Sequence, residues 1–204
     1  EFGGLHIMCN NAGISGRMHK SILHDDFGDF HRVMSVNVLG VMAGTRLAAH
    51  HMSEHSGGSI INLSSVGGVQ AGGGVMTYRA SKAAVIHFTK SAAIELAQYD
   101  VRVNCIAPGN IPTDLLAKAS STMSRAKAER MTQAMREMMN HDRPLPREGT
   151  PGDVAEAAVY FAGDRSGYLT GTVLAVDGGT TAGKPVVRTT AAVADGSAGQ
   201  RARS

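Results

Sequence analysis

The chain has 204 residues, 43% hydrophobic and 18% charged, which is typical of one globular domain with a single core. Its net charge of +3 belongs to residues 184–204, so the rest is formally neutral, and because it shows no basic stripe with interleaved aromatic residues we expect no nucleic-acid partner. The sequence shows neither a secretory leader nor an apolar run of about 18 residues, so we expect a cytoplasmic protein without membrane contact.

Strand and helix signals alternate from the start of the chain. The apolar run LHIMC (5–9) predicts a strand and is followed by the loop NNAGISG. Residues 25–55 have helical periodicity with a predicted break near Asn37, and SIINLSS (59–65) predicts a second, β-branched strand. Residues 76–98, which are rich in small side chains, predict a long helix that packs closely on its neighbours.

The same alternation continues in the second half. VRVNCIAP (101–108) predicts a third strand, which a Pro-Gly pair ends. Residues 110–149 are irregular apart from one Met-rich helical segment. Thr150 predicts the N-cap of a further helix that runs to about residue 162, and TVLAV (172–176) predicts a fourth strand. Apolar strands that alternate with helices predict an α/β fold with a parallel sheet covered on both faces.

Three loops should meet at one edge of this sheet. NNAG follows the first strand, Ser64 and Ser65 end the second, and PGNIPT follows the third. Because ligands of such sheets bind beyond the carboxyl ends of the strands, we expect the chemistry at this edge.

The sequence predicts no metal site and no disulfide. Cys9 and Cys105 lie in strand-like runs and match no zinc spacing, so we expect two reduced thiols. His50, His51 and His55 have a ligand-like spacing, but they lie at the polar end of a predicted helix, where histidine interacts favourably with the helix terminus. We therefore expect no metal there.

The segment TYRASK is the strongest candidate for catalysis. Tyr78 and Lys82 are four residues apart on a predicted helix, so they share one face. A free tyrosine has a pKa of about 10, and a fixed ammonium nearby favours the phenolate, so Lys82 is expected to lower the pKa of Tyr78. Such a tyrosine could act as a general acid or base toward an alcohol or ketone oxygen. The same pair also occurs as an ordinary surface contact.

Two more polar residues accompany this pair. Ser65 lies at the end of a predicted strand, thirteen residues before Tyr78, and is either a catalytic hydroxyl or an ordinary strand-end residue. Asn37 interrupts the apolar segment SVNVLG, where it either bonds locally to the backbone or kinks the helix and exposes polar groups to water. With Tyr78 and Lys82 they resemble the Asn–Ser–Tyr–Lys tetrad of the short-chain dehydrogenase/reductase family.

The resemblance covers about residues 1–180. It rests on six motifs in the family's order: NNAG (10–13), VNVLG (36–40), NLSS (62–65), YRASK (78–82), VRVNCIAPG (101–109) and YLTGTVLAVDGG (168–179). It implies a Rossmann-like, doubly wound parallel sheet, of which residues 1–180 form the C-terminal portion with about four strands. Residues 181–204, which lack periodicity, are expected to be a disordered tail.

The resemblance also implies a chemistry, the interconversion of a secondary alcohol and a ketone with NAD or NADP as the hydride carrier. Tyr78 would transfer the proton of the substrate oxygen, and Ser65 would bind the same oxygen. Lys82 would lower the pKa of Tyr78 and bind ribose hydroxyls, and Asn37 would hold a water that links Lys82 to solvent. The cofactor-binding residues implied are Asn10, Ala12, Gly13, Tyr78, Lys82, Pro108, Gly109, Ile111 and Thr113.

One element of the family is missing. The glycine-rich T-G-x-x-x-G-x-G turn is absent, because NNAGISG has the wrong spacing and follows the wrong strand. We therefore expect the C-terminal piece of an oxidoreductase, itself inactive, from which three strand–helix units are missing. The alternative is a truncated, inactive chain that serves as a binding or scaffold protein. A flavodoxin-like binding module would leave the tetrad unexplained.

The expected partners follow from the same resemblance. A small alcohol or ketone is the expected substrate. The Met-rich segment at 115–145 takes the place of the family's substrate loop, and it is either a packed helix or a flexible lid over an apolar substrate. The helices expected within 25–55 and 76–98 would assemble a homotetramer.

Overall fold

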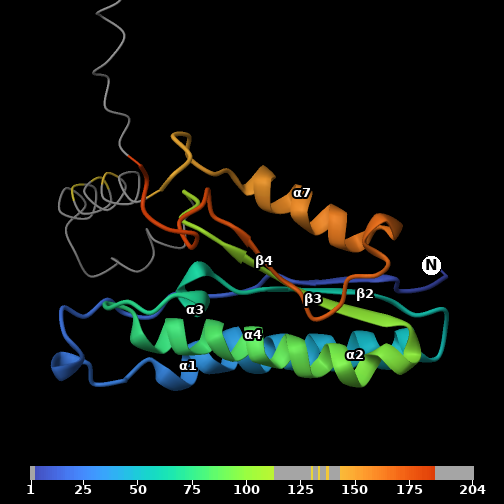
Figure 1. Ribbon diagram of the computed structural model, residues 1–204. Helices are drawn as coiled ribbons and strands as arrows, with labels where there is room; N and C mark the ends of the chain where they lie inside the picture. Colours follow the sequence, from blue (N-terminus) through green and yellow to red (C-terminus); the bar gives the residue numbers. More distant parts are fainter. Residues whose placement is uncertain (1–2, 113–129, 131–132, 134–136, 138–142, 187–204) are drawn as a thin grey trace, which may run out of the picture.

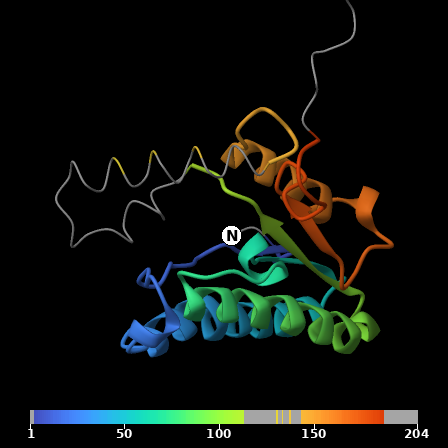
Figure 2. The same cartoon turned by 60° about the vertical axis from the view of Figure 1, so that its left-hand side comes forward.

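The computed structural model describes residues 3–112, 130, 133, 137 and 143–186. Its centre is a four-stranded sheet in the order β1-β2-β3-β4, with every neighbouring pair parallel. Helices α1, α2 and α4 cover one face and α7 covers the other, as both views show (Figures 1 and 2). The predicted fold class, a parallel sheet flanked by helices on both faces, is thus confirmed.

The elements follow the predicted order closely. The strands are β1 (Ile7–Asn10), β2 (Gly58–Leu63), β3 (Val101–Pro108) and β4 (Val173–Val176). The helices are α1 (Phe30–Met34), α2 (Gly40–Ser53), α3 (Val66–Val69), α4 (Met76–Leu96) and α7 (Pro151–Ala162), with a π-helical turn η2 (Ser35–Leu39) and 3-10 turns η1 (Ile22–His24), η3 (Ala97–Tyr99) and η4 (Asp164–Ser166).

The helix predicted over residues 25–55 is divided where the sequence indicated. Asn37 lies in the π-helical turn η2, between α1 and α2, and is fully buried. A π-helical turn is a recognised cause of local helix distortion and is frequent at functional sites. The predicted break near Asn37 is confirmed.

Two apolar layers hold the helices to the sheet. Neighbouring residues of a strand point to opposite faces, so Ile60 packs with Met52 of α2 while Ile61 packs with Phe161 of α7. All four of these side chains are at most 1% exposed. The two layers explain why the strands read as continuous apolar runs rather than alternating ones.

The parallel register brings the three motif-bearing strand ends to one edge. Asn10 at the end of β1 pairs with Asn62, and Leu63 at the end of β2 pairs with Ile106. The loops that follow β1, β2 and β3 therefore leave the sheet on the same side, as predicted.

The C-terminal elements carry their own local signals. Thr150 caps α7 in a reciprocal capping box with Asp153, and Pro151 occupies the first turn. After β4, the amides of Thr181 and Ala182 still bond to the preceding turn.

Most of the predicted tail, beyond residue 186, and the bulk of the Met-rich segment fall outside the described residues, so both remain predictions. Among the helices that the structure describes, none is long and apolar enough to cross a membrane.

Candidate active site

Tyr78 and Lys82 share one face of α4, as their spacing predicted. The Nζ atom of Lys82 lies 5.8 Å from the centroid of the Tyr78 ring. The ammonium is nearly enclosed, with 4% of Lys82 exposed, and it donates to the Leu63 carbonyl over 2.9 Å at the end of β2. The helix thus presents a half-buried phenol and a buried amine at the carboxyl edge of the sheet.

The pKa of Tyr78 moves in the direction opposite to the one expected. Burial raises the pKa of Tyr78, while hydrogen bonding with Ser65 and the positive charge of Arg79 lower it. Lys82 is not among the groups that shift it. The reason is that desolvation of the phenolate outweighs these favourable interactions.

The pKa of the Lys82 amine at this edge of the sheet is strongly shifted. Burial lowers the pKa of Lys82 from 10.5 to about 8, with a smaller opposing effect of Cys105. Burial also raises the pKa of the Cys105 thiol, to about 11. A lysine that gives up its proton near neutral pH can relay protons, and perturbed groups of this kind gather at functional sites.

Ser65 lies at the junction of β2 and α3. Its hydroxyl accepts from the Gly67 amide over 3.1 Å and so caps the short helix α3. The Ser65 hydroxyl also interacts with the Tyr78 phenol, which is why it lowers the pKa of that group. The side chains of Ser65 and Tyr78 lie side by side, since a Cβ on Gly67 would be 3.5 Å from Ser65 Oγ and 3.6 Å from Tyr78 Cε1.

Asn37 joins this group through α4 and the β1 loop. Its Oδ1 accepts from the Ile14 amide over 2.8 Å, and its Nδ2 donates to the Ile14 carbonyl and to Ser81, at 2.9 and 3.0 Å. The Ser81 hydroxyl in turn donates to the Tyr78 carbonyl over 2.7 Å. The predicted kink is present, but the side chain of Asn37 bonds to segments far away in the sequence, which is neither a local backbone bond nor exposure to water.

At the end of β1, Asn10 is packed inside the fold, while Ala12 in the loop that follows is exposed. Asn10 is buried, and its Nδ2 donates to Asn62 and Thr45, at 2.8 and 3.2 Å, beneath the sheet. Any part it takes in cofactor binding would come from its backbone. Ala12 is exposed. A Cβ on Gly13 would lie 3.2 Å from Lys82 Nζ and 3.4 Å from Asn37 Oδ1, so this glycine keeps a space open next to both.

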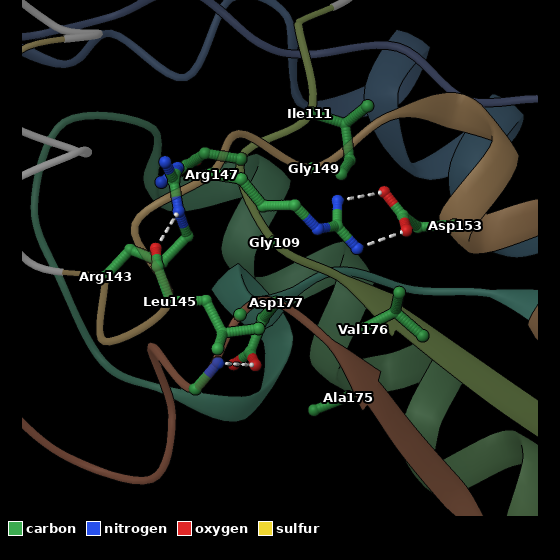
Figure 3. A pocket seen from close by; sticks show the side chains of 13 residues that line it. Gly109, Ile111, Arg143, Leu145, Arg147, Gly149, Asp153, Ala175, Val176 and Asp177 are labelled. Carbon is green, nitrogen blue, oxygen red and sulfur yellow. Dashed lines mark hydrogen bonds and ion pairs between the residues drawn. The ribbon is translucent and has the colours of Figure 1, made fainter.

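The residues after β3 border a cavity of about 290 Å³. Gly109 and Ile111 line it, as Figure 3 shows, and Pro108 lies at the end of β3 beside them. Thr113, the remaining predicted cofactor residue, lies outside the described residues. The predicted cofactor residues that the structure describes therefore lie at or after the ends of β1 and β3 and, for Tyr78 and Lys82, on α4.

Several charged residues of this cavity were missed in the sequence. Arg147 forms an ion pair with Asp153, at 2.7 Å, and Arg143 donates to the Leu145 carbonyl (Figure 3). The hydrogen bonds from Arg147 and Thr150 hold the pKa of Asp153 well below its usual range. Burial would raise the pKa of Asp177, but hydrogen bonds from Thr181 and Gly179 lower it overall. For Arg143, Arg147 and Asp153, the only sequence signal of such a site was the charged run RPLPREGTPGD (143–153).

A second group of metal-type ligands lies in the loop before α1. His19, Asp25 and Asp26 place one ligand atom each within 4.8 Å of one another. Asp25 already accepts from the Phe27 amide, and Asp26 accepts from Gly28 and pairs with Arg17. We assign no cation to this group.

A family model described as enoyl-(acyl carrier protein) reductase matches residues 1–181, nearly the whole described region. The chain belongs to the short-chain dehydrogenase/reductase family. It is 42% identical over 186 residues to 3beta-hydroxysteroid dehydrogenase 1 of Eggerthella lenta, covering 89% of this chain and 65% of that protein. It is 38% identical over 183 residues to zerumbone synthase of Zingiber zerumbet, covering 88% of this chain and 67% of that protein.

Solved structures of the family have the same fold. The gluconate 5-dehydrogenase of Burkholderia cenocepacia, in complex with NADP and tartrate, superposes with a TM-score of 0.75 at 30% identity. The match covers 89% of this chain and 67% of that structure. The chain thus spans about two thirds of the length of the relatives that it matches.

Proposed function

We propose that the protein to which this chain belongs is an NAD(P)-dependent oxidoreductase that interconverts a secondary alcohol and a ketone. The observation that carries the proposal is the convergence of Ser65, Tyr78 and Lys82 at the carboxyl edge of the sheet, from the end of β2 and one face of α4. The dehydrogenases among its relatives support the same class of reaction.

Tyr78 and Ser65 would act on the substrate oxygen. Tyr78 transfers the proton, to the oxygen during reduction and from it during oxidation. Ser65 donates a hydrogen bond to the same oxygen and stabilises the charge that develops on it. Because burial raises the pKa of Tyr78, the phenol is in its neutral form near neutral pH and can donate a proton to a carbonyl oxygen.

Lys82 and Asn37 would support the proton transfer by Tyr78, Lys82 by exchanging a proton and Asn37 by holding the neighbouring segments in place. Lys82, with a pKa of about 8, can exchange a proton near neutral pH and can donate further hydrogen bonds beside its contact to Leu63. Asn37 holds the β1 loop against α4 through Ile14 and Ser81. It would therefore keep Gly13 and Lys82 in place more than it would hold a water.

The residues at this edge fit a nicotinamide cofactor. Gly13 keeps open the space beside Lys82 Nζ, a donor suited to ribose hydroxyls. Gly109 and Ile111 line the cavity beyond β3. Pro108, Asn10, Ala12 and Thr113 are the other proposed contacts. The cofactor, when bound, supplies or accepts the hydride. Either NAD or NADP is compatible with these residues.

The test is turnover by the protein at its native length. NAD(H) and NADP(H) are combined with a panel of carbonyl and alcohol substrates, and the change in absorbance of the reduced nicotinamide is followed. Ser65→Ala should lower kcat by roughly 100-fold, as for the loss of one oxyanion donor, and Ser91→Ala on the exposed part of α4 should not. Tight cofactor binding without turnover on any substrate would favour the alternative, a binding or scaffold protein.

The assembly proposed from the sequence, a homotetramer, is supported by exposed apolar side chains on the helices concerned. Leu47 of α2 is 64% exposed and Ile94 of α4 is 82% exposed. Light scattering should therefore give four times the subunit mass, and Ile94→Glu should lower it. A monomeric protein of native length would contradict this assignment.

A further inference from the structure

The side chain of Arg79, next to Tyr78 on α4, reaches the far end of α3. Its Nη1 donates to the carbonyl of Gln70 over 2.9 Å. Gln70 is the C-cap of α3, and its own amide donates to the Val66 carbonyl over 2.8 Å. The guanidinium therefore holds the residue that caps the C-terminal end of this one-turn helix.

Ser65 is the N-cap at the other end of the same turn. Its hydroxyl accepts from the Gly67 amide and its carbonyl accepts from the Gly68 amide over 2.9 Å. Since a single helical turn separates Ser65 from Gln70, we expect movement at one end to reach the other. A contact that fixes Gln70 thereby limits how far the Ser65 hydroxyl can move from Tyr78.

Close contacts restrict both the middle of α3 and the loop that follows it. A Cβ on Gly68 would lie 2.6 Å from the carbonyl carbon of Lys82, so α3 and α4 touch backbone to backbone in the middle of the turn. A Cβ on Gly72 would lie 2.5 Å from Nη2 of Arg79, so a side chain at this position would push the guanidinium aside. Figure 1 shows α3 lying over the first turns of α4.

The charge of Arg79 also acts on its neighbour. It is the positive group that lowers the pKa of Tyr78, against the larger effect of burial. Arginine suits both tasks, because its planar fork can donate to the Gln70 carbonyl while its charge remains fixed at any working pH.

We propose, resting on the oxidoreductase function above, that Arg79 is a positioning residue that clamps α3 so that Ser65 stays beside Tyr78 and places a permanent positive charge at the phenol. It acts through these two residues and touches neither substrate nor cofactor in this role. Arg79→Met removes the charge and the hydrogen bond, Arg79→Lys keeps the charge, and Gly72→Ala displaces the guanidinium while keeping it on the chain.

The charge effect is measured without substrate. The chain has four tyrosines and no Trp, so phenolate absorbance follows tyrosine ionisation cleanly, and the difference between each protein and its Tyr78→Phe counterpart isolates Tyr78. The pH at which half of Tyr78 is ionised, the Tyr78 midpoint, should rise in Arg79→Met and return toward the wild-type value in Arg79→Lys. Lys90→Met, an exposed lysine on the same helix, should leave it unchanged.

The clamp is measured by hydrogen exchange at the amides of Gly67, Gly68 and Gln70. Exchange there should be roughly tenfold faster in Arg79→Met and in Gly72→Ala, while the amides of β3 keep their protection. An unchanged Tyr78 midpoint together with unchanged exchange in Arg79→Met would overturn the proposal. If Arg79→Met fails to fold, unchanged exchange in Gly72→Ala overturns the clamp.

Turnover separates this proposal from the proposed function. Arg79→Met should lower kcat by roughly tenfold with little change in KM, and it should shift the pH profile of kcat in the direction of the Tyr78 midpoint. A Tyr78→Phe protein with normal turnover would refute the oxidoreductase mechanism instead, while the titration and exchange results would still decide the contacts of Arg79.

Discussion

Replacement of Lys82 by methionine should change how the stability of the protein depends on pH. The pKa of Lys82 is about 8 in the folded chain and 10.5 for an ordinary lysine. As pH rises, the folded state therefore loses this proton first, and between pH 8 and 10.5 the unfolded state binds more protons. The free energy of unfolding must rise across this window, and below pH 8 the cost of burying the ammonium is present in full.

The size of the effect follows from the difference of 2.5 in pKa between 10.5 and 8, which amounts to about 3 kcal/mol over the whole window. Between pH 7 and pH 9 alone, the wild type should gain about 1 kcal/mol from this group. Lys82→Met cannot titrate, so it should lack that gain, whatever constant offset results from losing the bond to the Leu63 carbonyl.

Urea unfolding at pH 7, 8 and 9, followed by circular dichroism, measures this difference. The series stops at pH 9 because the thiol of Cys105, whose pKa burial raises to about 11, lowers stability above its ordinary value of 9.0. Lys90→Met, an exposed lysine of the same helix, should retain the wild-type gain. If Lys82→Met gains as much stability as the wild type between pH 7 and 9, Lys82 is not the buried amine described here.

Two further substitutions test the fold around the site by urea unfolding at pH 7. Gly68→Ala forces a methyl group to within 2.6 Å of the Lys82 backbone and should lower the free energy of unfolding by about 1–3 kcal/mol. Gly73→Ala is the control, because no atom lies within 4 Å of its Cβ, and it should cost well under that. Equal losses in the two variants would contradict the backbone contact of α3 and α4. Thr150→Ala breaks the capping box of α7 and should cost about 1 kcal/mol, while Thr150→Ser should restore most of it; an unchanged stability in Thr150→Ala would mean that α7 does not depend on this cap.

Strong local signals made most of the fold predictable. β3 and α7 begin and end within a residue of their predicted limits, because a Pro-Gly pair stops the strand and Thr150 with Pro151 starts the helix. The break at Asn37 was also predictable, since a polar residue in an apolar helical run has no simple place in an α-helix. α3 was missed because its sequence, VGGV, has no helical propensity, and only the Ser65 cap and the contact with α4 stabilise it.

The sequence predicted which side chains gather at this edge of the sheet, but not how they interact with one another. The spacing of Tyr78 and Lys82 placed them on one face, yet the direction of the Tyr78 pKa depends on burial, which a spacing does not reveal. Asn10 was predicted at the cofactor, whereas its side chain bonds to Asn62 and Thr45, contacts that only the register of β1 with β2 creates. The ion pair of Arg147 and Asp153 likewise required knowing how the chain turns before α7.

The most direct test of the proposed function is the turnover of Tyr78→Phe in the protein at its native length. The comparison is with wild type and with Tyr168→Phe, whose side chain is fully exposed, using the substrate and the nicotinamide cofactor that give the highest wild-type rate. We expect Tyr78→Phe to lose roughly 100- to 10,000-fold in kcat with cofactor affinity largely retained, and Tyr168→Phe to be unaffected. Turnover of Tyr78→Phe within a few-fold of wild type would contradict the assignment of Tyr78 as the proton-transferring group.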